Sequence, residues 1–295
     1  MASDPEAAPE RAVLARWPLA ALFLGSTLLA FGPLLVRLAD VGPVASAFWR
    51  MALAAPALIV VALLLRRGET GRMAFSALPW GIGTVAGAFF AADLIVWHLG
   101  IVRTSMANAT LFANTTAFML AGWAILVRRE RPQRTTVQSL ALAGAGAMLL
   151  FGSSAQLGTA HLLGDMLSLL AAAFYTGYLL TIMRLRGQLS TATVLAMSTC
   201  ASVLVLLPAA LVEPAAFWPG DWRPVLGLAV SSQLAGQGLM VFASGRLPAF
   251  VVGIGLLVQP LVSAAAGWLL FGEALGPIEL LGAGMIAAAL VLIRR

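Results

Sequence analysis

The sequence predicts an all-α membrane protein with ten transmembrane helices, arranged as two inverted five-helix repeats (5+5). The first observation is composition: 61% of the 295 residues are hydrophobic and only 10% are charged, whereas a soluble domain averages about half apolar and about a quarter charged residues. The mean hydropathy of +0.95 agrees with this. The second observation is that apolar runs recur along the whole chain, and the third is that its two halves share a pattern.

A helix that crosses about 30 Å of hydrocarbon needs roughly 20 apolar residues. Runs of this kind predict ten spans, separated by short connectors that contain Gly, Pro, Arg and acidic residues. The predicted spans are residues 18–37, 43–65, 76–98, 104–127, 135–152, 163–183, 191–212, 224–244, 248–271 and 276–293. The connectors are too short to hold a soluble domain.

Residues 1–17 are predicted to form a cytoplasmic N-terminal tail. The segment from Met1 to Glu10 is acidic and contains proline, unlike the basic start of a secretory signal peptide. The first apolar run is therefore expected to remain in the protein as a helix. Residues 18–153 are then predicted to form the first repeat and residues 163–293 the second.

The arginines predict the orientation of the chain. There are 18 basic residues against 12 acidic ones, for a net charge of +6, and all the basic residues are arginine. Arg37, Arg103 and Arg223 fall on one predicted side and Arg50 lies inside the second span, while the other arginines fall on the opposite side. Because cytoplasmic loops carry the excess of positive charge, both termini are expected in the cytoplasm.

Matching segments about 145 residues apart indicate an internal repeat. Residues 121–123 and 266–268 both read Ala-Gly-Trp, and each triplet is followed shortly by a glutamate, Glu130 or Glu273. Each glutamate precedes a Gly-rich closing span. Chance similarity between two Gly/Ala-rich segments is the alternative explanation.

An odd number of helices in each repeat predicts that the two copies are inverted. When five-helix copies are joined in one chain they cross the membrane in opposite senses, about an axis in the bilayer plane. The connector at 128–134 carries four arginines, whereas its counterpart at 271–276 carries none. This difference is expected if only the first of these connectors faces the cytoplasm.

Several function classes are excluded by what the chain lacks. Cys200 is the only cysteine, so neither a disulfide framework nor a CxxC site can form within the chain. His98 and His161 are far apart and make no HExxH-like pair. The absence of lysine excludes a P-loop and Schiff-base chemistry. Because the arginines are scattered between apolar runs, nucleic acid is not expected as a partner, and no metal or cofactor is expected.

The chain resembles EamA-type units of the drug/metabolite transporter superfamily. The resemblance is carried by Arg50 within residues 48–54, by the segment 104–130, and by its echo at 247–273 with Pro260 at mid-helix. It covers nearly the whole chain, although its motifs are loose ones. The resemblance implies a ten-helix carrier of the bacterial inner membrane that exports small metabolites. Among the branches of the superfamily, the chain resembles the aromatic amino acid exporters represented by YddG.

One departure from the family pattern concerns the fourth span. The second copy has Gln259-Pro260, but the first has Asn114-Thr115-Thr116, so only the ninth span would carry the proline break of the family. Pro260 lacks an amide donor and frees the carbonyl of Leu256, four residues earlier. A proline kink that merely shapes helix packing is the alternative.

Polar side chains near mid-membrane are the candidate substrate-binding residues. In an inverted-repeat carrier the substrate site is expected near the midplane, where interrupted helices release backbone groups. On an α-helix, residues four apart share a face, so the two glutamines of the eighth span are expected to point toward one polar object. The alternative is that such residues hold helices together, at about 0.6 kcal/mol per contact. The candidates are Asn114, Thr115, Ser232, Gln233, Gln237 and Gln259.

Asp93 and His98 are candidates for proton coupling. Asp93 is the one acidic residue well inside a span, and His98 follows near the outer end of the same span. A carboxylate in hydrocarbon is costly, so we expect it to face a cavity or to be neutralised by Arg50 or Arg103. A hydrated pair in an outer vestibule is the alternative.

Aromatic residues complete the predicted site. Tyr175 and Tyr178 are three residues apart at the middle of the sixth span and share a helix face. Trp97 lies beside the predicted outer vestibule. Their apolar area and hydroxyl groups would suit the side chain of an amino acid.

The function predicted from the architecture and the resemblance is export of small metabolites, amino acids with aromatic or other apolar side chains, by alternating access around a midplane cavity. Multidrug or cation efflux is the alternative within transport, and an intramembrane enzyme or a scaffold is the alternative outside it. No nucleophile is arranged beside a base in the sequence, so an enzyme is not expected. The expected partners are the small-molecule substrate and membrane lipid, and a monomer is compatible with this interpretation.

Overall fold

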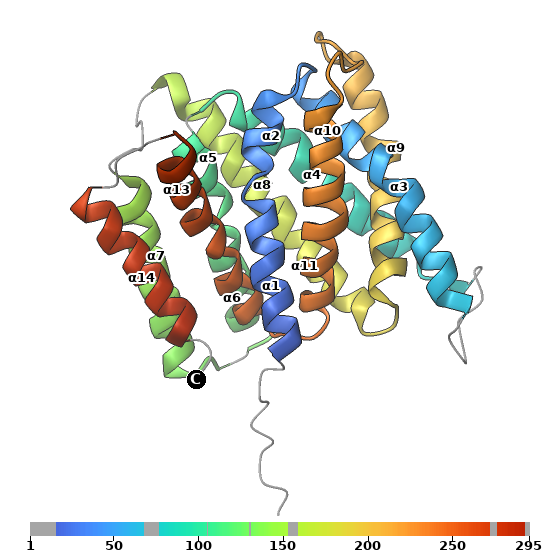
Figure 1. The fold of residues 1–295 in the computed structure, drawn as a ribbon. Coiled ribbons are helices and arrows are strands. Elements are labelled where there is room, and N and C mark those ends of the chain that lie inside the picture. Colours follow the sequence, from blue (N-terminus) through green and yellow to red (C-terminus); the bar gives the residue numbers. More distant parts are fainter. Residues whose placement is uncertain are drawn as a thin grey trace, which may run out of the picture.

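The computed structural model describes residues 16–67, 77–104, 106–129, 131–152, 159–271 and 276–292, and every regular element in these ranges is a helix. The helices group into ten units that coincide with the ten predicted spans, which confirms the predicted fold class (Figure 1). In chain order they are α1 (Arg16–Leu29), α2 (Gly32–Leu38), α3 (Pro43–Arg67), α4 (Trp80–Ile101), α5 (Met106–Ala113), α6 (Thr116–Leu126), α7 (Arg134–Gly152), α8 (Thr159–Arg186), α9 (Thr191–Val212), α10 (Arg223–Gly227), the π-helix η2 (Leu228–Gly236), α11 (Gln237–Ser244), α12 (Ala249–Leu256), α13 (Val258–Phe271) and α14 (Pro277–Leu292).

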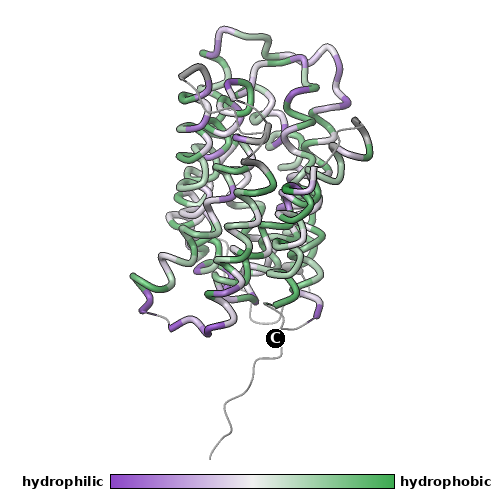
Figure 2. The backbone as a smooth tube through the Cα atoms, turned by 90° about the vertical axis from the view of Figure 1, so that its left-hand side faces the viewer, coloured by the Kyte–Doolittle hydropathy of each residue, from purple (hydrophilic) through white to green (hydrophobic). Residues whose placement is uncertain are grey.

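Eight of the ten units are long and apolar enough to cross a membrane, judged by length and composition. Of the other two, α14 is apolar but has only 16 residues, and α7 begins with the polar sequence Arg-Thr-Thr. Hydrophilic residues gather at the two ends of the bundle, and hydrophobic residues fill the band between them (Figure 2). The chain is therefore a multi-pass membrane protein.

The helix contacts follow the symmetry of an inverted repeat. If each of the first five units is exchanged for its counterpart in the second half, the packing of α4 on α8 becomes that of η2 and α11 on α1, and both contacts exist. The pairs α3–α9 and α7–α14 are each exchanged into themselves, and the contact of α6 with α12 becomes that of α13 with α5, which also exists. In Figure 1, α1 leads upward and its counterpart α8 leads downward.

Four of the ten units are interrupted. The first is broken between α1 and α2, the fourth between α5 and α6, and the ninth between α12 and α13, while the eighth contains η2. In the ninth unit, Leu257 lies between the two helices and Pro260 falls in the first turn of α13, where a missing amide donor is tolerated.

The fourth unit is interrupted although it has no proline at the break. The Asn114 side chain donates to the carbonyl of Thr110 at 2.7 Å, the Thr115 hydroxyl to that of Phe112 at 2.6 Å, and the Thr116 hydroxyl to that of Ala113 at 3.0 Å. These short polar side chains compete with the backbone for carbonyls of the preceding turn. In the first repeat the helix break therefore coincides with consecutive Asn and Thr residues, whereas in the second repeat the equivalent break coincides with a proline.

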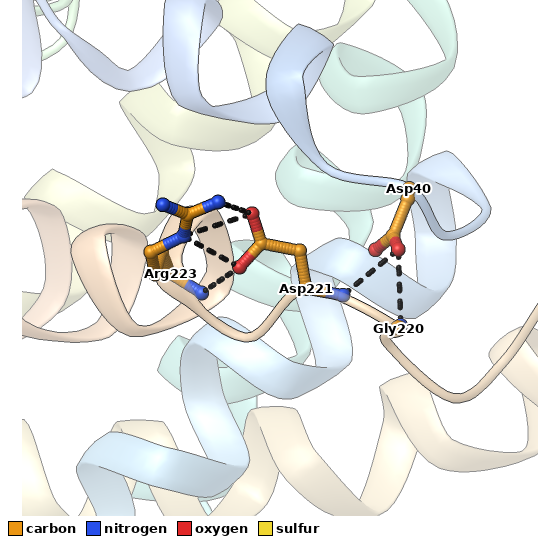
Figure 3. Close-up of polar contacts among 4 residues, drawn as sticks. All are labelled: Asp40, Gly220, Asp221 and Arg223. Carbon is orange, nitrogen blue, oxygen red and sulfur yellow. Dashed lines mark hydrogen bonds and ion pairs between the residues drawn. The ribbon is translucent and has the colours of Figure 1, made fainter.

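Hydrogen bonds join two connectors at one end of the bundle. The Asp40 carboxylate, after α2, accepts hydrogen bonds from the backbone N–H groups of Gly220 at 3.0 Å and Asp221 at 2.9 Å, before α10 (Figure 3). Asp221 in turn pairs with Arg223 at 2.8 Å, and the hydrogen bonds from Arg223 hold the pKa of the Asp221 carboxyl below its ordinary value. Nearby, Glu213 accepts from the first backbone amides of α3. These contacts fix the ends of α3 and α9 against each other.

The α7–α14 contact provides a test of the packing. A Cβ added at Gly282 would lie 2.6 Å from the carbonyl oxygen of Gly146 and from the backbone nitrogen of Leu150, whereas one added at Gly284 would meet nothing within 4 Å. We expect Gly282→Ala to lower the thermal unfolding temperature in detergent, because overpacking costs about 1–3 kcal/mol. Gly284→Ala is the matched control and should melt at the same or a higher temperature. Equal effects of the two substitutions would contradict the close packing of these helices.

Candidate functional site

A partly open cavity lies between the two halves of the bundle. Its volume is about 70 Å³, which is room for several water molecules. Both repeats contribute to its wall. The lining residues are Leu29, Arg50, Phe90, Asp93, Leu94, Trp97, Ala113, Asn114 and Thr116 from the first repeat, and Ala172, Tyr175, Gln237, Leu256 and Gln259 from the second.

All four interrupted units reach this cavity at their interruptions. Leu29 is the last residue of α1, Asn114 lies between α5 and α6, and Gln237 is the first residue after η2. Leu256 and Gln259 flank the break between α12 and α13. Irregular backbone within a membrane is tolerated where protein buries it or where it lines a cavity. The interruptions therefore meet at the cavity.

The cavity wall carries one positive and one negative side chain. Arg50 of α3 and Asp93 of α4 are only 3% and 7% exposed. They are close enough to interact electrostatically, but among the described residues they do not meet in a direct ion pair. Of the two partners expected for Asp93, the structure brings Arg50 to it, because Arg103 lies beyond the end of α4 and donates to the carbonyl of Leu99.

Two buried donors in the wall have no partner within the described part of the chain. These are Nε of Arg50 and Nε2 of Gln237. The other side of the Gln237 amide, Oε1, accepts a hydrogen bond from the Tyr175 hydroxyl at 3.4 Å. Because an unsatisfied buried donor costs about 1–3 kcal/mol, this wall favours a ligand or water that accepts hydrogen bonds.

The structure brings six of the sequence-predicted residues together and sets the others apart. Those that line the cavity are Asp93, Trp97, Asn114, Tyr175, Gln237 and Gln259, and those outside the lining are His98, Thr115, Tyr178, Ser232, Gln233 and Pro260. Of the second group, the Thr115 hydroxyl is bonded to Phe112, and Tyr178 stacks on Phe90 with ring centroids 4.4 Å apart. The Tyr178 hydroxyl is buried near Gln237 and Ser198 without a well-aligned hydrogen bond.

Gln233 and Gln237 do not share a face, contrary to the expectation from an α-helix. The Gln233 amide donates to the Thr199 hydroxyl of α9 at 3.0 Å, while Gln237 faces the cavity. Gln233 lies within η2 and Gln237 begins α11. The two amides therefore meet different neighbours, the Gln233 amide on α9 and the Gln237 amide at the cavity.

His98 belongs to the packing of two helices and not to a hydrated vestibule. It is completely buried, and its Nδ1 lies 3.0 Å from the carbonyl oxygen of Pro43 and 2.8 Å from the hydroxyl of Ser46, at the start of α3. Asp93 lines the cavity, and His98 is not among the lining residues. The hypothesis of proton coupling therefore concerns Asp93 alone.

Eight of the fourteen lining residues were not among the predicted site residues, and three of these eight, Arg50, Phe90 and Thr116, are charged, aromatic or polar. Phe90 could have been found, because Phe90, Asp93 and Trp97 are spaced three and four residues apart and so lie on one face of a helix. Arg50 also carries a signal, since a lone arginine inside an apolar span is costly unless it serves a site. Among the described residues, no cluster of three or more His, Cys, Asp or Glu side chains could hold a metal ion.

Comparisons with known proteins agree with this architecture. The sequence profile of the EamA-like transporter family matches residues 16–152 and 162–295, one match for each repeat. A solved crystal structure superimposes with a TM-score of 0.76 at 16% identity, covering 93% of this chain and 96% of the other. That likeness concerns the fold.

Two relatives of known activity are similar in sequence. The threonine/homoserine exporter RhtA of Escherichia coli is 31% identical over 149 residues, which are 50% of this chain and 50% of that protein. The chain thus covers about half the length of that relative. The pseudopaline exporter CntI of Pseudomonas aeruginosa is 23% identical over 214 residues, 72% of this chain and 74% of that protein. Neither is named as an exporter of aromatic amino acids, so that branch stays a prediction.

The buried contacts of His98 predict a role in stability. We expect His98→Ala to lower the thermal unfolding temperature by an amount that corresponds to about 1–3 kcal/mol, since a buried hydrogen bond to Pro43 is lost. His161→Ala, at the half-buried histidine of the first turns of α8, is the control and should melt like the parent. A His98→Ala protein that is as stable as the parent but has lost transport would instead give His98 a direct role in function.

Proposed function

Because the chain belongs to the EamA-like transporter family, we propose that it exports a small amino-acid-like metabolite by alternating access of its two repeats around the central cavity. One observation carries the proposal: the cavity at the junction of the repeats is lined by a cationic and an anionic side chain together with an amide donor that has no hydrogen-bond partner among the described residues. A bundle that served only as a scaffold would gain nothing from such a costly interior.

The named activities of the relatives support an amino-acid-like substrate. RhtA is named for threonine and homoserine and CntI for pseudopaline. A cavity of about 70 Å³ is also small beside pockets for drug-sized ligands, which measure about 300–1,000 Å³. Both observations favour a small metabolite over a multidrug substrate.

Cation efflux is a weaker candidate because the cavity is balanced in charge. A site for lipophilic cations would be expected to hold an uncompensated acid, but Asp93 shares the cavity wall with Arg50. An intramembrane enzyme would need a nucleophile beside a base or a metal. The described side chains around the cavity form no such group.

Hollows at the two ends of α4 would suit access from either side. One lies near its C-terminal end, with a volume of about 390 Å³, and is lined by residues that include Arg37, Ile101 and Thr104. The other, of about 770 Å³, lies near its N-terminal end and includes Arg128 and Arg184. We assign the second end to the cytoplasm of a bacterial inner membrane, since the arginines concentrate on that side.

The Gln237 amide gives a direct test of the cavity. We expect Gln237→Ala to reduce export from proteoliposomes about tenfold, because the cavity wall loses an amide group that can hydrogen-bond to the proposed substrate. Gln233→Ala is a matched control on the same unit, since that amide is bonded to Thr199. It should keep at least half of the parental flux per folded molecule while melting at a lower temperature. If the two variants lose flux equally, the cavity wall is not the substrate site.

Topology can be tested by labelling. In a Cys200→Ala background, we expect Thr70→Cys to react with a membrane-impermeant maleimide from the cytoplasmic side and Glu273→Cys from the opposite side. The reason is that the connectors after the second and ninth spans are separated by an odd number of crossings. Everted and right-side-out vesicles distinguish the two. Labelling of both positions from one side would contradict the inverted arrangement.

A further inference from the structure

Arg50 and Asp93, the two charged side chains in the described cavity wall, do not form a direct ion pair with each other. The guanidinium carbon of Arg50 lies 5.8 Å from the centre of the Phe90 ring, one helical turn before Asp93 on α4. Its Nε has no hydrogen-bond partner in the described ranges, and no direct ion pair joins it to Asp93. Opposite charges buried together repay their loss of hydration only when their hydrogen-bonding groups are satisfied. A ligand that bridges the two groups would satisfy them.

The unpaired groups are complementary to a zwitterion. A planar carboxylate matches the donor fork of a guanidinium, whereas an ammonium group has donors only and suits a carboxylate. An α-amino acid carries both groups on one carbon, so its opposite charges are a few bond lengths apart and sum to zero. A ligand with only one of these charges would leave either Arg50 or Asp93 uncompensated in a low-dielectric site.

The rest of the wall separates polar from apolar surface. Gln237, whose Nε2 lacks a partner, is bonded to Tyr175, and Tyr175 is within electrostatic reach of both Arg50 and Asp93. Gln237 and Tyr175 line the same cavity as the two charged groups. Phe90, Leu94 and Trp97 of α4 supply apolar surface on the same wall, which suits the side chain of the ligand.

We propose that Arg50 binds the carboxylate and Asp93 the ammonium group of one substrate, so that the protein selects α-amino acids in which both groups are free. This inference rests on the proposed function, and it names the substrate class and the two side chains that define it. Arg50 and Asp93 then set specificity through the backbone of the amino acid, and the apolar wall acts on its side chain.

The test compares an amino acid with its own derivatives. A panel of radiolabelled L-amino acids is first offered to proteoliposomes, and the one that moves fastest is then compared with its methyl ester, which lacks the carboxylate, and its N-acetyl form, which lacks the ammonium. We expect both derivatives to move at least about tenfold more slowly. If no amino acid moves at all, the proposed function fails. If the free amino acid moves but its derivatives move equally well, only the present inference fails.

Variants assign each charge to its partner. In Arg50→Gln the preference for the free amino acid over its methyl ester should collapse to within about twofold, while the preference over the N-acetyl form persists. Asp93→Asn should show the reverse pattern. Arg103→Gln, which removes an arginine outside the cavity, is the control and should keep both preferences. A purely structural role would lower all three rates in parallel, and unchanged preferences in Arg50→Gln and Asp93→Asn would overturn the assignment.

If a variant does not fold, the derivative panel on the parent protein still decides the question. Thermal stabilisation of the parent by the amino acid but not by its two derivatives is a second readout, since a ligand that binds the native state raises its stability by mass action. Equal stabilisation by all three compounds would overturn the proposal.

Discussion

The structure depends on one constraint: within hydrocarbon, every backbone N–H and C=O group must find a partner inside the protein. Uninterrupted helices meet it along most of the ten units. The exceptions are the four interrupted units, and all four reach the central cavity at their interruptions. The breaks themselves therefore lie at the cavity, and the cavity depends on these helix breaks as well as on the side chains that line it.

The two repeats interrupt equivalent helices with different chemistry. In the second repeat Pro260 follows the break and lacks a backbone donor, whereas in the first repeat the side chains of Asn114, Thr115 and Thr116 take up backbone carbonyls. The cavity wall is also asymmetric: both repeats supply polar groups, but the charged pair comes from the first repeat and two of the lining amides come from the second.

The buried charges explain why the cavity differs from the rest of the core. Most of the interior is apolar and is packed through Ala, Leu, Val and Phe, and glycines such as Gly146 and Gly282 bring helices into close contact. Arg50 and Asp93 cannot be accommodated in that way, because buried charges need partners. Their burial in a balanced but incomplete pair links the stability of the bundle to the chemistry of the ligand that we propose for it.

The sequence alone determined the helical class, the ten spans and the two-fold repeat, because the length and hydrophobicity of a membrane helix are imposed locally by the bilayer. It also pointed to Asp93, Asn114, Tyr175, Gln237 and Gln259, since polar residues in apolar spans are few. Only the tertiary structure decided which of these residues meet. It placed Gln233 and His98 in helix packing and brought Arg50 and Phe90 beside Asp93. The physical reason is that the groups a side chain meets depend on which helix packs opposite it, and this is not encoded in hydropathy.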